Sequence, residues 1–82
     1  MRIYMQKPAE DKNTPRFYHI LIQKDLLGGW SLVREWGSQG ASGRVKKTHY
    51  ESRDDAEKAF MASRDSQLDK GFNVVFMEGT YI

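Results

Sequence analysis

Apolar and polar residues alternate along much of this chain with the two-residue period of a β-strand. Five segments carry this pattern, or the β-branched and aromatic residues that strands favour. They are residues 2–6, 16–23, 29–36, 44–51 and 72–78. Because successive side chains of a strand point to opposite faces, each segment also predicts which of its residues share a face.

The third and fourth segments place basic and aromatic residues on shared faces. One face of residues 29–36 consists of Trp30, Leu32, Arg34 and Trp36. The two faces of residues 44–51 are Arg44, Lys46, Thr48 and Tyr50 on one side, and Val45, Lys47 and His49 on the other. A regular strand thus separates Lys46 from Lys47. Both lysines reach one surface only if a bulge or the strand end twists them together.

Residues 52–71 carry the helical pattern. Ser52 is the expected N-cap, and Asp54 and Asp55 lie in the first turn, where the helix dipole favours negative charge. Gly71 is the expected stop at the C′ position. The apolar stripe that would face the core is narrow and comprises Ala56, Ala59, Phe60, Ser63 and Leu68.

Turn-forming residues separate these elements. Residues 7–15 are polar and contain two prolines, Gly28 and Gly29 precede the third strand, and three glycines in residues 37–43 predict a second turn. The predicted order is four strands, one helix and one strand. This order predicts an α+β fold, with an antiparallel β-sheet of about five strands and one α-helix packed on one face.

Composition limits the chemistry more than it identifies a partner. The 82 residues include ten aromatic ones and no cysteine, which excludes a disulfide framework and a thiolate metal site. The net charge is +2, but residues 1–50 carry nine Lys or Arg against four Asp or Glu, and residues 51–82 carry four against seven. This asymmetry gives either one basic and one acidic face or ordinary solvated surface. With no apolar run of membrane length and no signal peptide, we expect a cytoplasmic protein without a membrane partner.

No residue pattern indicates catalysis. His19 and His49 lie on different predicted strands without a paired carboxylate at motif spacing, and no serine lies in a nucleophile-elbow context. Two separate histidines do not make a metal site. The glycines of residues 37–43 resemble a phosphate-binding loop, but such a loop leads into a helix, whereas this one leads into a strand. We therefore expect no enzyme activity, no metal and no cofactor.

Basic residues interleaved with aromatic ones are typical of a surface that meets nucleic acid, because cations neutralise phosphates and aromatic rings stack on bases or sugars. Trp36 has Arg34, Arg44, Lys46 and Lys47 nearby in the predicted strands. The alternative is that Trp36 closes the end of the core and the basic residues are merely solvated. The residues alone leave both interpretations open.

The segment FYHILIQKDLLGGWSLVREWGSQGASGRV, residues 17–45, resembles the WGR domain. The motif of that family usually reads close to W-G-R-I/V-G-x-x-G-Q. The match extends to RFY at the start of the second strand and to DKGF at the end of the helix, so residues 1–82 are expected to form a single short WGR domain of bacterial type. The resemblance implies an antiparallel sheet with one helix. It also implies DNA binding, as in the DNA-dependent poly(ADP-ribose) polymerases, where the domain helps to bind strand breaks.

The resemblance also assigns residues by position. The motif Trp is Trp36 and the first Gly is Gly37, and the two later glycines are Gly40 and Gly43. In the polymerases the Trp packs against the nucleic-acid end, and the motif Arg contributes contacts with DNA or with neighbouring domains. The same role is therefore implied for Trp36.

Three motif positions depart from the family pattern. Ser38 stands in place of the Arg, Gln39 in place of the aliphatic residue, and Arg44 in place of the final Gln. Ser38 cannot make the charge-assisted contacts of a guanidinium. Arg44 and its neighbours are therefore the expected source of positive charge.

The sequence thus favours a non-enzymatic module that binds nucleic acid, DNA in the first place, by its backbone or ends. The predicted binding residues are Arg34, Trp36, Gly37, Arg44, Lys46 and Lys47. The alternative is a protein-interaction module that docks a partner or a second copy through the sheet edge, or through an aromatic patch around Trp30 and Trp36. Salt dependence separates the two, because phosphate-led binding weakens steeply as salt rises.

Overall fold

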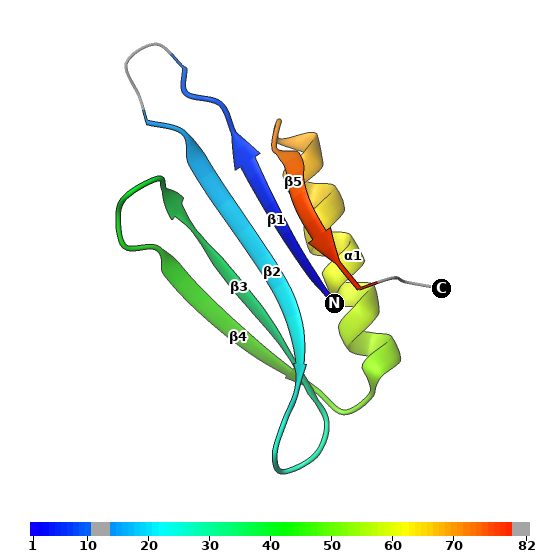
Figure 1. Ribbon diagram of the computed structural model, residues 1–82. Coiled ribbons are helices and arrows are strands. Elements are labelled where there is room, and N and C mark those ends of the chain that lie inside the picture. Colours follow the sequence, from blue (N-terminus) through cyan, green and yellow to red (C-terminus); the bar gives the residue numbers. More distant parts are fainter. Residues whose placement is uncertain (11–13, 80–82) are drawn as a thin grey trace.

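Five strands and one helix make up the residues that the computed structural model describes, 1–10 and 14–79 (Figure 1). The elements are β1 (Arg2–Lys7), β2 (Arg16–Lys24), β3 (Trp30–Ser38), β4 (Arg44–Tyr50), α1 (Arg53–Asp69) and β5 (Asn73–Glu78). The predicted elements are therefore confirmed in type and order, and the α+β class with them. Part of the predicted loop over residues 7–15 lies outside the described residues.

All strand pairs are antiparallel, in the order β4-β3-β2-β1-β5. The first four strands form a meander, and β5 follows α1 and pairs with β1 (Figure 1). The helix thus carries the chain back across the sheet to its far edge. The β1–β5 register shifts between Tyr4 and Met5, which leaves Val75 as the extra residue of a β-bulge. β4 and β5 are the two edges of the sheet.

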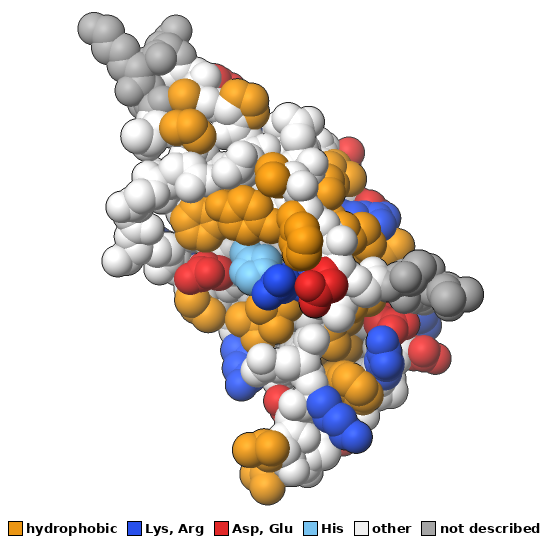
Figure 2. Space-filling view, viewed as in Figure 1, with side chains coloured by type: hydrophobic (Ala, Val, Ile, Leu, Met, Phe, Trp, Pro, Cys, Tyr) orange, Lys and Arg blue, Asp and Glu red, His pale blue; other side chains and the backbone are white. Residues whose placement is uncertain are grey.

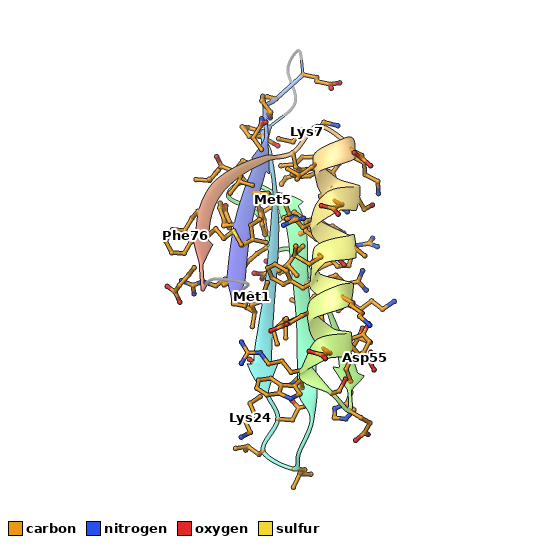
Figure 3. The ribbon with its side chains drawn as sticks, turned by 90° about the vertical axis from the view of Figure 1, so that its right-hand side faces the viewer. Met1, Met5, Lys7, Lys24, Asp55 and Phe76 are labelled. Carbon is orange, nitrogen blue, oxygen red and sulfur yellow. The ribbon has the colours of Figure 1, made fainter. Side chains whose placement is uncertain are left out.

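One face of the sheet packs against α1 and the other face is open. Ile3 and Met5 of β1 lie opposite Ile20 and Tyr18 of β2, and all four are buried because strand alternation turns them towards the helix. Figure 3 shows Met5 between the strands and α1, whereas Phe76 projects from the other face. The other buried members of the core cluster are Leu32, Phe60 and Phe72.

α1 begins where its capping residue predicts. Ser52 Oγ accepts a hydrogen bond of 3.1 Å from the backbone N–H three residues further on. The predicted apolar stripe is wrong at its C-terminal end, because Leu68 is 39% exposed and Gln67 is buried instead. At roughly 100° per residue, Gln67 lies almost in line with Phe60 on the helix, whereas Leu68 is rotated away from it by about 80°. Among the described residues, no helix is long and apolar enough to cross a membrane.

Turn geometry explains the glycines of residues 37–43 only in part. Gly40 has a φ of +79°, which favours glycine, but Gly37 and Gly43 lie outside the left-handed region. A Cβ atom on Gly43 would lie 2.8 Å from the carbonyl oxygen of Trp36 and 2.9 Å from Cζ of Phe17. Gly43 is therefore required because the β3–β4 turn packs closely against the Phe17 ring and its own backbone.

Replacing Gly43 by alanine is expected to lower the free energy of unfolding by about 1–3 kcal/mol, because the opposing carbonyl of Trp36 belongs to the backbone and cannot turn aside. Ser42→Ala is the matched control at the exposed neighbouring position, and it should change stability by less than about 0.5 kcal/mol. Urea denaturation of the three proteins measures both effects. Equal effects at the two positions would show that close packing is not what requires glycine at residue 43.

Candidate nucleic-acid interface

The register of the sheet brings four predicted site residues together on the face that packs against α1. Trp36 lies opposite Arg44, and Arg34, two residues before Trp36, lies opposite Lys46. The four side chains form a two-by-two block where β3 ends and β4 begins. Gly37 follows Trp36 and lines a groove beside it.

Three further cations complete this basic surface, and sequence interpretation missed them. Lys7 lies opposite Arg16 at the paired ends of β1 and β2, and Lys70 follows α1. Figure 3 shows Lys7 near the C-terminal end of α1. The sequence does contain a signal that could have placed Lys7 beside Arg16. If the first two strands form a hairpin, the residues at the two ends of its loop must face each other.

These residues line a cleft between the sheet and the C-terminal end of α1, with a volume of about 830 Å³. Its aromatic residues are Phe17, Tyr18, Trp36 and Phe72, and its basic residues are Lys7, Arg16, Arg34, Lys46 and Lys70. No carboxylate is among the described residues that line it. The partial negative charge at a helix C-terminus favours cations in this place.

Trp36 lines both this cleft and a smaller groove of about 370 Å³. Its ring stacks on Tyr18, with centroids 5.6 Å apart and an interplanar angle of 13°, and its side chain stays partly exposed. The smaller groove also contains Arg16, Ser38 and Arg44. Trp36 therefore packs on the core and also lines two hollows. It closes the end of the core, as one interpretation of the sequence had it, and it is still exposed enough to contact a ligand, as the other requires.

Among the described residues, the cations beside Trp36 have no neutralising partner. No ion pair found within residues 1–10 and 14–79 involves Arg34, Arg44 or Lys46. The Nε atom of Arg34 is buried and has no hydrogen-bond partner in the part of the chain that the structure describes. Arg34 and Lys46 also lie directly opposite each other, and like charges in this position destabilise a sheet. The block therefore carries unbalanced positive charge.

Lys47 does not join this surface. It lies opposite Val33, and the register of β3 with β4 is regular from Trp30 to Trp36. Since no bulge rotates the strand, Lys47 points to the open face of the sheet, away from Lys46. The predicted separation of the two lysines on a regular strand is therefore confirmed, and Lys47, although among the predicted binding residues, is not part of the block around Trp36.

The predicted aromatic patch around Trp30 and Trp36 does not form either. The two residues lie near opposite ends of β3, which separates them by about 20 Å. The guanidinium of Arg53 lies over the Trp30 ring, 5.2 Å from its centroid. Each tryptophan therefore belongs to a different surface.

A second polar cluster lies at the base of the β2–β3 turn, where the sequence indicated no carboxylate near a histidine. Asp25 accepts a hydrogen bond of 2.7 Å from Ser31 Oγ and lies 2.7 Å from Nδ1 of His49. The Nε2 atom of His49 is 3.3 Å from Glu51. Because the carboxylate lies between the hydroxyl and the imidazole, His49 cannot take a proton from Ser31, and the cluster is not a nucleophilic triad. The described part of the chain holds no group of three His, Asp or Glu side chains placed to bind a metal.

These contacts shift the pKa values of the cluster. The hydrogen bond from Ser31, followed by that with His49, lowers the pKa of Asp25 below its ordinary value of 3.8. The hydrogen bond with Asp25 raises the pKa of His49 above its ordinary value of 6.5. His19, on the open face, behaves differently, because burial and the nearby charge of Arg2 lower its pKa.

Protonated His49 should stabilise the β2–β3 turn. Because its pKa is raised in the folded state, this stabilisation is fully present below about pH 6.5 and is lost as the pH rises through the folded-state pKa. Asp25 stays ionised throughout, since its pKa is lowered. His49→Gln should therefore lower Tm more at about pH 5.5 than at about pH 8.5, as thermal melts followed by circular dichroism will measure. The same loss of Tm at both pH values would contradict this assignment.

Comparison with known proteins identifies the family. The family model of the WGR domain matches residues 1–76. The uncharacterized protein y4dW of Sinorhizobium fredii is 27% identical over 71 residues, which make up 87% of this chain and 35% of that protein. The chain thus spans about a third of the length of this relative. No solved structure matches the chain.

The resemblance seen in the motif around Trp36 is confirmed by this match. WGR domains are binding modules of the nucleic-acid type. The matched region runs from β1 into β5 and includes the motif in which Ser38 replaces arginine. This chain therefore belongs to the WGR domain family.

Proposed function

We propose that this chain is a non-enzymatic module that binds DNA by its sugar–phosphate backbone or at an end, through the cleft around Trp36. The family supports the class of ligand, because WGR domains are binding modules of the nucleic-acid type. The geometry supports the cleft as the binding site. Cations from four strands and from the end of α1 line this cleft together with aromatic residues.

The observation that carries the proposal is the uncompensated pair of Arg34 and Lys46. Like charges on neighbouring strands destabilise the sheet, and a buried guanidinium nitrogen without a partner adds a further penalty. A bound phosphate would relieve the charge repulsion, because it balances the charges of Arg34 and Lys46 and can accept charge-assisted hydrogen bonds from the part of the guanidinium that lines the cleft. The arrangement is therefore more favourable with an anion bound than without one.

In the proposed complex, the Trp36 ring contacts a base or a deoxyribose beside that phosphate. Tyr18 stacks parallel to the ring, so the ring is held in place before DNA arrives and loses little conformational entropy on binding. Stacking of this kind contributes about 1–3 kcal/mol per base and tolerates any sequence. It therefore favours binding of the backbone and of ends over recognition of a base sequence.

The serine at the third motif position removes a guanidinium, and two neighbouring strands supply others. Arg16 of β2 lies directly opposite Ser38, and Arg44 of β4 lies opposite Trp36. Both arginines line the smaller groove together with Ser38. In the proposed complex these two residues provide the positive charge that the family's arginine would place here.

Fluorescence anisotropy with labelled nicked, blunt-ended and single-stranded DNA tests the proposal. Binding through four to five phosphates should weaken with salt, with a slope of about −4 in a plot of log K against log salt. RNA oligonucleotides of the same sequences show whether the cleft distinguishes the two nucleic acids. If no nucleic acid binds at about 50 mM salt, the proposal is wrong.

A further inference from the structure

β5 is an edge strand with an exposed apolar row. Four consecutive residues make up this row, and their exposed fractions are Val74 47%, Val75 57%, Phe76 44% and Met77 44%. Single exposed apolar residues are ordinary on a protein surface, but a contiguous row on an edge strand is not. An edge of this kind is a template for another strand unless something blocks it.

The opposite edge of the sheet is blocked. β4 exposes Arg44, Lys46 and Lys47, and charged side chains, lysine above all, prevent edge-to-edge pairing. Within β5, Glu78 is the one charged residue, and it lies at the end of the strand in an ion pair with β1. The bulge at Val75 twists β5 locally, but it adds no charge that would repel a second strand. The β4 edge is therefore protected by charge against pairing with another strand, whereas the β5 edge is not.

The apolar surface of β5 reaches both faces of the sheet. Met77 lies opposite Ile3, on the face of α1, whereas Phe76 lies opposite Tyr4 on the open face. The guanidinium of Arg2 lies over the Phe76 ring, 5.4 Å from its centroid. Figure 2 looks onto the side of the sheet away from α1 and shows apolar side chains gathered across it. Aromatic residues, methionine and arginine of this kind are enriched at the centres of protein interfaces.

We propose that β5 pairs antiparallel with β5 of a second copy of this chain, so that two sheets join into one. In any register that aligns residues 74–77 of the two copies, apolar side chains meet each other and no like charges face one another. Pairing β4 with β4 would instead bring together two edges that each carry an arginine and two lysines. Pairing β4 with β5 would leave a free edge at each end and extend into chains. Of these arrangements, β5 with β5 alone is both closed and free of charge repulsion.

The pairing has a consequence for the cleft around Trp36. The two-fold axis of such a joined sheet is perpendicular to the sheet, so both α1 helices and both clefts lie on the same face. The pairing itself rests on the β5 edge. Binding of one DNA molecule by both clefts of a dimer rests in addition on the proposed function. Each cleft would then bind its own stretch of the DNA backbone.

Sedimentation velocity of the full chain without DNA, from micromolar to hundreds of micromolar, tests the pairing. The expected species is a dimer of twice 9.5 kDa. Val75→Lys should give the 9.5 kDa monomer, whereas Val45→Lys, at the 63% exposed valine of β4, should leave the dimer intact. A wild-type chain that remains monomeric overturns the proposal, and so does a Val75→Lys chain that remains dimeric.

Cysteine cross-linking gives a second measurement without an added charge on the edge. The chain has no cysteine, so Val75→Cys or Phe76→Cys introduces a single thiol. Oxidation should give a disulfide-linked dimer from at least one of these β5 variants and not from Val45→Cys. Equal cross-linking at both edges, or none at β5, overturns the pairing. Neither measurement uses DNA, so a failed pairing is distinguishable from a failed proposal of DNA binding.

Discussion

The combined substitutions Arg34→Glu and Lys46→Glu are expected to weaken DNA binding by more than about 100-fold at low salt. Each charge-assisted contact is worth about 1.5–3 kcal/mol, and about 1.4 kcal/mol corresponds to a tenfold change in affinity. The two residues face each other beside Trp36, so two carboxylates there would remove the partners of a phosphate and also repel it. Anisotropy titrations between about 50 and 200 mM salt measure the loss, and the salt slope should become shallower by about 2.

Lys24→Glu combined with Lys47→Glu is the matched control, because it changes the net charge by the same amount. Both lysines are exposed and line a different hollow, beside the β2–β3 turn. We expect this double variant to lose less than about tenfold in affinity, since neither lysine lines the cleft and Lys47 lies on the other face of the sheet. Equal losses in the two double variants would mean that binding follows net charge and that the cleft is not the site. Circular dichroism must show both variants folded, because Arg34 is partly buried.

The fold could be predicted because its elements are decided by near neighbours in the sequence. Alternation marks each strand, and Ser52 and Gly71 mark the ends of α1 through capping chemistry. The block of Trp36, Arg34 and the basic residues of β4 could be predicted for a related reason. Its residues lie on two consecutive strands joined by a short turn, so face alternation and hairpin pairing together place them side by side.

The features that the sequence did not predict depend on contacts between distant segments of the chain. Lys7 and Arg16 meet because of the register between β1 and β2. Asp25 reaches His49 across 24 residues of chain, because β3 places the β2–β3 turn beside β4. Gly43 shows the same limit, since its need for space comes from a ring on another strand. The periodicity of one segment carries no information about its register with a partner strand. These contacts could therefore not be predicted from the hydrophobic pattern.

Phe60→Ala is expected to lower the free energy of unfolding by about 3–5 kcal/mol, because it leaves a cavity where α1 meets the sheet. Phe60 is fully buried, and a chain of 82 residues has about 4–12 kcal/mol of stability in all. Urea denaturation followed by circular dichroism measures the loss. Leu68→Ala, on the same helix but 39% exposed, should lose less than about 1 kcal/mol. If the two substitutions were equally damaging, the helix would bury the stripe that includes Leu68, and the packing that places Gln67 in line with Phe60 would be wrong.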